Sequence, residues 1–156
     1  MTQHTKHTDL TLDISSKTDL LVEVRTFVTD AARAFGFADD DVSNIELAVD
    51  EACTNIIKHA YQYNPAGRIR LAISSTAEQG QPRRFIITIH DDGLSFDASH
   101  YTLPDMTQYF QRPRRGGLGV VLMKKLMDEV EYSIAPGAPN AIRLVKYLLP
   151  LHPRSA

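Results

Sequence analysis

The longest continuous pattern in the sequence is a helical one, which runs from residue 39 to about residue 61. Its apolar residues recur three or four positions apart, so they form one stripe along a helix that must be buried against another layer. The acidic residues 39–41 suit the positive end of the helix dipole at its start. The stripe consists of Val42, Ile45, Val49, Ala52, Cys53, Ile56, Ile57 and Ala60.

The flanking segments supply the layer that this stripe needs. Alternating apolar residues predict strands at 10–14 and 69–73, and denser apolar runs predict strands at 85–89, 131–134 and 141–149. Further helices are predicted from Leu20 to Phe35, ahead of a capping Gly36, and over 118–130. Strands that follow one another in runs favour an α/β (α+β) two-layer sandwich, a mixed sheet with three helices on one face.

Length and composition restrict the class of protein. The 156 residues fit one domain, expected over 10–150, with flexible tails at 1–9 and 151–156. A net charge of −2 argues against direct nucleic-acid binding. The single cysteine, Cys53, excludes an internal disulfide, and no run approaches the roughly 18 apolar residues of a membrane helix. We therefore expect a cytoplasmic protein that does not contact a membrane.

Two polar residues on the long helix are candidates for chemistry. Glu51 and Asn55 are one turn apart and hence on the same side. Side-chain oxygens are the ligands that Mg²⁺ prefers, and a carboxylate one turn away suits a general base. A solvated helix face is the plainer interpretation of the two residues alone.

A second candidate is Asp91, which ends an apolar strand and is followed by Asp92 and Gly93. Such a carboxylate can accept a hydrogen bond from an exocyclic amine, and the glycine permits a flat group to approach closely. An ordinary Asp-Gly turn explains the same residues.

The third candidate is a glycine-rich turn before the last helical segment. Gly116, Gly117 and Gly119, with Leu118 between them, would expose backbone N–H groups at a helix start, which favours phosphate. Arg115 and the neighbouring arginines would add charge, although a solvated basic rim fits them equally well. The turn matches neither the Walker nor the Rossmann pattern, and alone it is also compatible with a linker.

In this order, the three segments resemble the GHKL ATPases, the superfamily of gyrase, Hsp90, MutL and sensor histidine kinases. The runs ELAVDEACTNIIKHAY (46–61) and GGLGVVLMKKLMDEVEY (116–132) are especially similar to the bacterial anti-sigma-factor serine/threonine kinases of the RsbW and SpoIIAB type. The resemblance extends from about residue 10 to 149 and includes the closing IRLVKYL. It implies the Bergerat, or histidine kinase-like, ATPase fold.

The resemblance also implies roles for residues. Asn55 would bind Mg²⁺, Glu51 would be the general base, and Asp91 would accept the adenine amine, with Gly93 beside the ring. The remaining nucleotide contacts would come from a lid at 98–115 and from phosphate-binding residues. The phosphate-binding residues would be His59, Arg115, Gly116, Gly117, Leu118 and Gly119. Ser95 stands where the family commonly has a second glycine, which leaves the behaviour of the lid open.

The resemblance implies a switch in which the protein binds ATP and Mg²⁺, phosphorylates a STAS-domain anti-anti-sigma protein and sequesters a sigma factor, as a homodimer. The alternative is a regulatory module that binds ATP and sequesters a protein without kinase activity. A purely structural domain would require three motifs to coincide by accident. The sequence does not identify the partner or the upstream signal.

Overall fold

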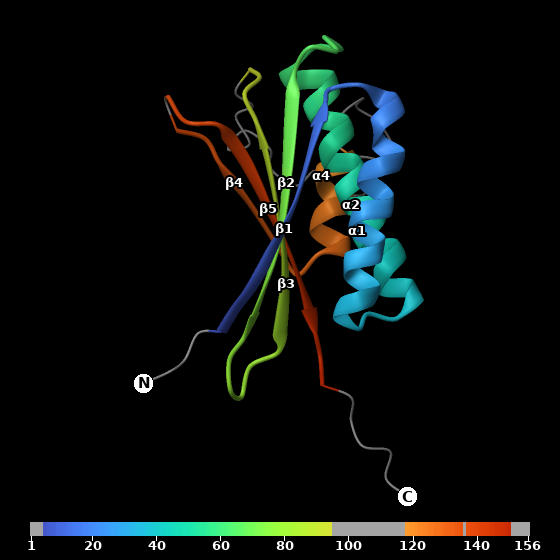
Figure 1. Ribbon diagram of the computed structural model, residues 1–156, viewed down its shortest axis with the longest axis vertical. Coiled ribbons are helices and arrows are strands. Elements are labelled where there is room, and N and C mark those ends of the chain that lie inside the picture. The colour runs from blue at the N-terminus through green and yellow to red at the C-terminus, as the bar shows by residue number, and fades with distance from the viewer. Residues whose placement is uncertain (1–4, 95–117, 136, 151–156) are drawn as a thin grey trace, which may run out of the picture.

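The computed structural model describes residues 5–94, 118–135 and 137–150, which form two layers (Figure 1). The helices of this part are α1 (Leu21–Phe35), α2 (Asp39–Asn55) and α4 (Leu118–Leu126), with short turns η1 (Thr18–Leu20) and η2 (Ile56–Ala60). The strands are β1 (Thr5–Ser15), β2 (Arg68–Ala77), β3 (Arg83–Asp91), β4 (Glu129–Ser133) and β5 (Asn140–Leu148). The three α-helices and five strands of the described residues agree with the elements predicted from the sequence.

The sheet has the order β1-β2-β3-β5-β4, and all four pairings between its described strands are antiparallel. The α+β two-layer sandwich is therefore confirmed, but the prediction of a mixed sheet is wrong. The reason lies in β5, which inserts between β3 and β4. These two strands run in the same direction on either side of it, and neither pairs with the other.

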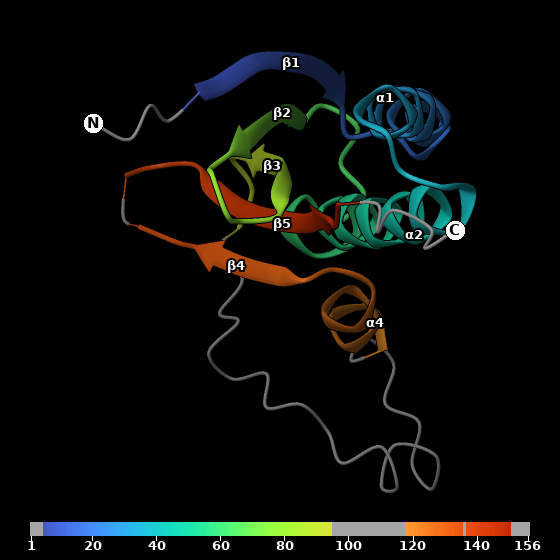
Figure 2. The same ribbon diagram turned by 90° about the horizontal axis from the view of Figure 1, so that it is seen from below.

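The helices α1, α2 and α4 all cover the same face of the sheet (Figure 2). The predicted stripe of α2 and η2 is buried there in one apolar core with residues of β2, β3 and β5. Cys53 belongs to this core, and burial raises the pKa of its thiol to about 12, so it stays protonated and serves as a packing residue. The strand residues that meet the helices are fully or almost fully buried, and they include Ile69, Leu71, Ile73, Phe85, Ile87 and Ile89.

Element boundaries differ from the predicted ones at a few ends. α1 ends at Gly36 as expected, with a left-handed φ of 117°. β1 starts at Thr5 and pairs with β2 from that residue, so the strand enters the segment expected to be a tail. α4 ends at Leu126 rather than near residue 130, because the chain turns there into β4. No helix in the described ranges has the length and apolarity of a membrane span.

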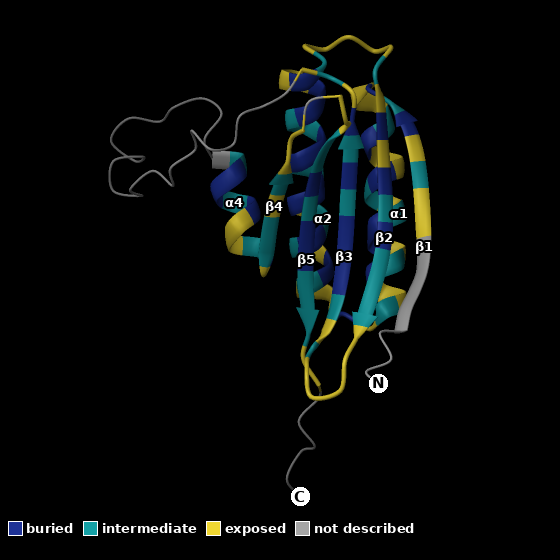
Figure 3. Cartoon of the chain, turned by 90° about the vertical axis from the view of Figure 1, so that its left-hand side faces the viewer, coloured by how far each residue is buried: buried dark blue, intermediate teal, exposed yellow. Residues whose placement is uncertain are grey.

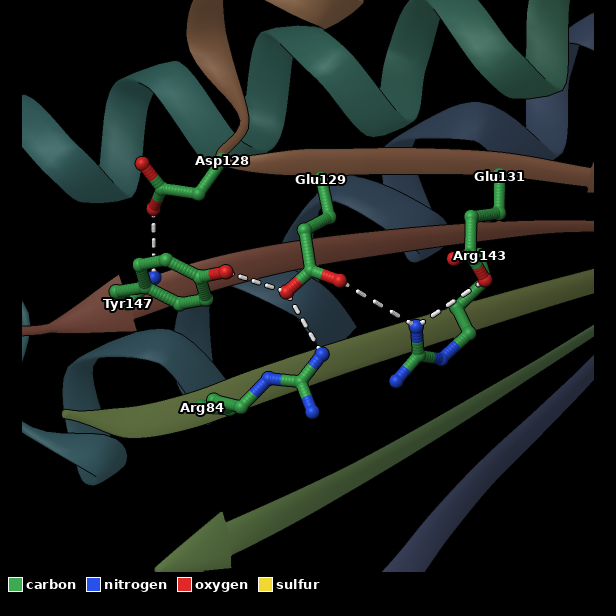
Figure 4. Close-up of polar contacts among 6 residues, drawn as sticks. All are labelled: Arg84, Asp128, Glu129, Glu131, Arg143 and Tyr147. Atoms are coloured by element: carbon green, nitrogen blue, oxygen red, sulfur yellow. Dashed lines mark hydrogen bonds and ion pairs between the residues drawn. The ribbon is translucent and has the colours of Figure 1, made fainter. Parts of the chain in front are cut away.

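The other sheet face carries no helix in the described part of the chain (Figure 3). Polar side chains of β3, β4 and β5 bind one another across these strands. Glu129 on β4 accepts hydrogen bonds from Arg84 at 2.7 Å and from the Tyr147 hydroxyl at 2.6 Å. Arg143 lies between Glu129 and Glu131, at 3.9 and 3.3 Å (Figure 4). Hydrogen bonds from Tyr147 and then Arg84 hold the pKa of Glu129 below its usual value.

Glu129→Gln is expected to lower the free energy of unfolding by about 1–2 kcal/mol at neutral pH, because a neutral amide binds the two donors less strongly. A lowered pKa stabilises the fold only while the carboxylate is ionised. The difference from the wild type should therefore be full above the ordinary pKa of 4.5 and shrink as the pH falls below it. Urea denaturation at several pH values measures this, with Glu131→Gln, whose side chain is 64% exposed, as the near-neutral control. A difference independent of pH would contradict the ionic explanation.

Candidate functional site

A cavity lies between the end of α2 with its η2 turn and one end of the strands β3, β4 and β5. It holds about 620 Å³ of empty space, a figure that includes open solvent at its mouth. Its wall is mostly apolar, with a few polar side chains that could orient a ligand. The lining residues are Ala52, Asn55, Ile56, His59, Ala60, Asp91, Leu94, Val120, Tyr132, Ile134, Asn140, Ala141 and Ile142.

The helix that carries Asn55 changes form at the cavity. A regular α-helix was predicted up to about residue 61, but residues 56–60 form a π turn, in which the Tyr61 N–H donates to the Ile56 carbonyl at 3.0 Å. π turns inside helices are rare and are frequent at functional sites. Here the wider turn begins directly after Asn55 and supplies three of the lining residues, Ile56, His59 and Ala60.

Asp91 is the buried polar group of this wall. It ends β3, is only 6% exposed, and accepts two hydrogen bonds on Oδ1, from the Gly93 N–H and from Asn140 Nδ2, both at 3.0 Å. Burial raises the pKa of the carboxyl, while the bonds from Asn140 and Gly93 oppose that rise. A carboxylate kept largely away from water in an apolar wall is a strong acceptor for a ligand N–H group.

The turn after Asp91 is fastened to the end of the helix. The Tyr61 hydroxyl accepts from the Asp92 N–H at 2.8 Å, and the Leu94 N–H donates to the Ala60 carbonyl at 2.8 Å. A Cβ at Gly93 would lie 2.6 Å from that same carbonyl oxygen, so only glycine fits. The glycine predicted beside a bound ring is thus required by the close approach of the helix end, and it is absent from the cavity lining.

Glu51 and Asn55 meet the first turn of α4. A Cβ on Gly119 would lie 2.7 Å from Glu51 Oε2 and 3.3 Å from Asn55 Nδ2. The helix start predicted to bind phosphate is therefore packed directly on the two polar residues predicted to perform chemistry. Glu51 lies one turn before Asn55 and outside the cavity lining, so the arrangement leaves it at the edge of the site.

The remaining predicted residues divide into two groups. Leu118 begins α4, and His59 lines the cavity. Arg115, Gly116 and Gly117 lie outside the described residues, as do Ser95 and the predicted lid at 98–115. Among the residues that the sequence reasoning missed are Asn140, which lines the cavity, and Tyr61, which holds the turn after Asp91. The only signal for Asn140 was its position at the start of a strand that would have to neighbour β3.

The polar side chains of the cavity suit a magnesium ion that is held mainly by water and substrate phosphates and only in small part by the protein. In the described ranges no three His, Cys, Asp or Glu side chains form a metal-binding group. Mg²⁺ does not need such a group, because it keeps several waters and is often bound by one or two protein oxygens together with substrate phosphates. The Asn55 amide, on the cavity wall one turn from Glu51, provides an oxygen of this kind.

Comparison with known proteins shows what the chain is similar to. The histidine kinase-like ATPase domain matches residues 14–146. Proteins named serine-protein kinase RsbW, from Bacillus cereus strain Q1 and Bacillus anthracis strain A0248, are 28% identical over 141 residues, which is 88% of this chain and 83% of theirs. A structure of the RsbU and RsbW domains of a Mycobacterium tuberculosis protein has a TM-score of 0.62 at 16% identity, over 92% of this chain and 34% of that one. The chain therefore spans about a third of that protein, whose likeness concerns the fold alone.

Proposed function

Because the chain belongs to the histidine kinase-like ATPase domain family, we propose that it is an ATP-binding protein serine/threonine kinase. The observation that supports this best is the arrangement of one cavity. A buried carboxylate, Asp91, lies in its wall together with Asn55, and Glu51 lies one turn before Asn55, at the edge of the cavity. This arrangement, with Asp91 in the wall and Glu51 at the edge, suits a nucleotide whose base is buried and whose phosphates lie near the protein surface.

Each group has a role in the proposal. Asp91 accepts a hydrogen bond from the exocyclic amine of adenine, and the apolar wall excludes water from the ring. Asn55 holds Mg²⁺, which offsets the charge of the phosphates. Glu51 takes the proton from the attacking serine hydroxyl as general base. The N–H groups around Gly119 at the start of α4, with Arg115, Gly116, Gly117 and Leu118 before it and His59 across the cavity, contact the phosphates.

The proposed substrate is a STAS-domain anti-anti-sigma protein, and the proposed second partner is a sigma factor that the protein sequesters in the cytoplasm as a homodimer. The similarity to proteins named serine-protein kinase RsbW supports this assignment. Phosphate added to the STAS-domain protein near the interface would weaken its complex with the kinase through charge repulsion and desolvation. The kinase would then bind the sigma factor instead, so that the two complexes exclude each other.

We expect the purified protein to transfer phosphate from Mg-ATP to serine on a STAS-domain protein of the same genome. Transfer is measured as phosphoserine by mass spectrometry, with ATP binding measured separately by calorimetry. An unrelated small protein with exposed serines is the control for specificity. ATP binding without transfer to any STAS-domain protein would favour the alternative, a module that sequesters its partner without kinase activity. Absence of ATP binding would contradict both.

A further inference from the structure

Asn140 determines how the carboxylate of Asp91 is presented to the cavity. The two residues are paired directly across β3 and β5, and Asn140 Nδ2 donates both to Asp91 Oδ1 at 3.0 Å and to the Gly93 carbonyl at 3.1 Å. The Gly93 N–H donates to that same Oδ1. One oxygen of the carboxylate thus carries two hydrogen bonds, and neither of them uses Oδ2.

The other oxygen of Asp91, Oδ2, is the one left for a ligand. Asp91 and Asn140 both line the cavity, and within the described ranges no residue donates a hydrogen bond to Asp91 Oδ2. The carboxylate therefore presents a single acceptor position to the cavity. From this geometry, and resting on the proposed ATP site, we propose that Asn140 is a specificity-determining residue that selects adenine over guanine nucleotides.

The reason lies in the hydrogen-bonding edges of the two bases. Adenine has one exocyclic amine, and one free carboxylate oxygen is enough to accept its N–H group. Guanine has two donors side by side, the ring N1–H and the amine at C2, and a carboxylate pairs with both only when both of its oxygens are free. Because Asn140 and the Gly93 N–H together occupy Oδ1, one of the guanine donors is left without a partner in a largely apolar wall, which is the costly arrangement.

Asn140 also keeps Asp91 from turning. Its second bond, to the Gly93 carbonyl, fastens the amide to the turn that follows β3, and that turn is itself fastened to Tyr61 and Ala60. A side chain without a donor at position 140 would leave Oδ1 with the Gly93 N–H bond alone, which frees one acceptor position on Oδ1 and lets the carboxylate turn more easily. Asp91 would then offer two acceptor oxygens, which suits guanine better and adenine less well.

The test compares Asn140→Thr with Asn140→Val. Both replacements are β-branched residues of nearly equal shape that suit a strand, but only threonine has a hydroxyl that can donate to Asp91. Affinities for ATP and for GTP are measured by calorimetry with Mg²⁺ and without a substrate protein. We expect Asn140→Val to lower the ratio of ATP to GTP affinity by about tenfold, the effect of one hydrogen bond to a charged group, and Asn140→Thr to retain most of the preference.

A merely structural role at position 140 would have a different signature. Loosening of the strand start would lower both affinities together and leave their ratio at the wild-type value, and this result would overturn the inference while the proposed function stands. Asn44→Ala, a substitution of the same residue type near the start of α2, controls for unspecific effects. Wild-type protein that binds neither nucleotide would instead refute the proposed function itself. Urea denaturation of each variant checks that it is folded.

Discussion

Glu51→Gln is expected to reduce phosphoryl transfer to a serine of the substrate protein by about 10²–10⁴-fold, the usual contribution of a general base. ATP affinity should change little. The substitution keeps the shape of the side chain, and Glu51 lies outside the lining of the cavity that would hold the base. Its carboxylate instead lies at the edge of the site, against the start of α4 and one turn from Asn55.

The measurement separates the two steps. Single-turnover transfer gives the rate, and calorimetry gives ATP affinity for the same preparation. Glu46→Gln, on the same helix but five residues earlier, is the matched control and should transfer phosphate like the wild type. If Glu51→Gln transferred phosphate at the wild-type rate, Glu51 would have no role as a base. If it instead lost ATP binding, its role would be in holding the nucleotide.

The sequence predicted the helical layer well because helix burial is a local property. The stripe from Val42 to Ala60 repeats with the helical period, and those residues are indeed the ones packed on the sheet. Gly36 marks the end of α1 for an equally local reason, since its left-handed φ is easy only for glycine. Strands such as β2 and β3 were recognisable from alternation or density of apolar residues.

The order of the strands could not be predicted in the same way. Nothing local in β5 indicates that it inserts between β3 and β4, because the pairing is decided by which sheet buries most apolar surface. The failure to predict Asn140 as a residue of the site has the same cause. Asn140 belongs to a turn-like stretch in the sequence and reaches Asp91 only through the register of β3 with β5. A residue made important by a long-range pairing gives no signal in its own neighbourhood.

The π turn at the site has a similar explanation. Residues 56–60 continue the apolar stripe of α2, so the sequence predicted an unbroken α-helix. The turn is widened where the chain has to meet the segment after β3, through Ala60 and Tyr61. Gly93 was predicted to let a bound ring approach closely, whereas the structure shows the helix end packed against it. Contact with a bound ring stays a prediction.

Gly119→Ala is expected to lower phosphoryl transfer by about 10–100-fold with little loss of stability, because displacing a catalytic group by about 1 Å can cost this much. The added Cβ would lie 2.7 Å from Glu51 Oε2. That oxygen is the far end of a flexible side chain, so the carboxylate moves aside and the backbone does not have to. Alanine is also the better helix former, which favours α4.

A double-mutant cycle decides whether the glycine acts through Glu51. In the Glu51→Gln background the transfer rate no longer depends on where that side chain lies, so Gly119→Ala should cause almost no further loss. If the two losses multiply instead, Gly119 acts independently, as it would if its role were to hold phosphate through the backbone of α4. In that case Gly119→Ala should also weaken ATP binding, which calorimetry on the single variant would reveal. Loss through Glu51 predicts little change in ATP affinity, because the new methyl group lies nearest to Glu51 and Asn55 and not to Asp91, which is proposed to hold the base.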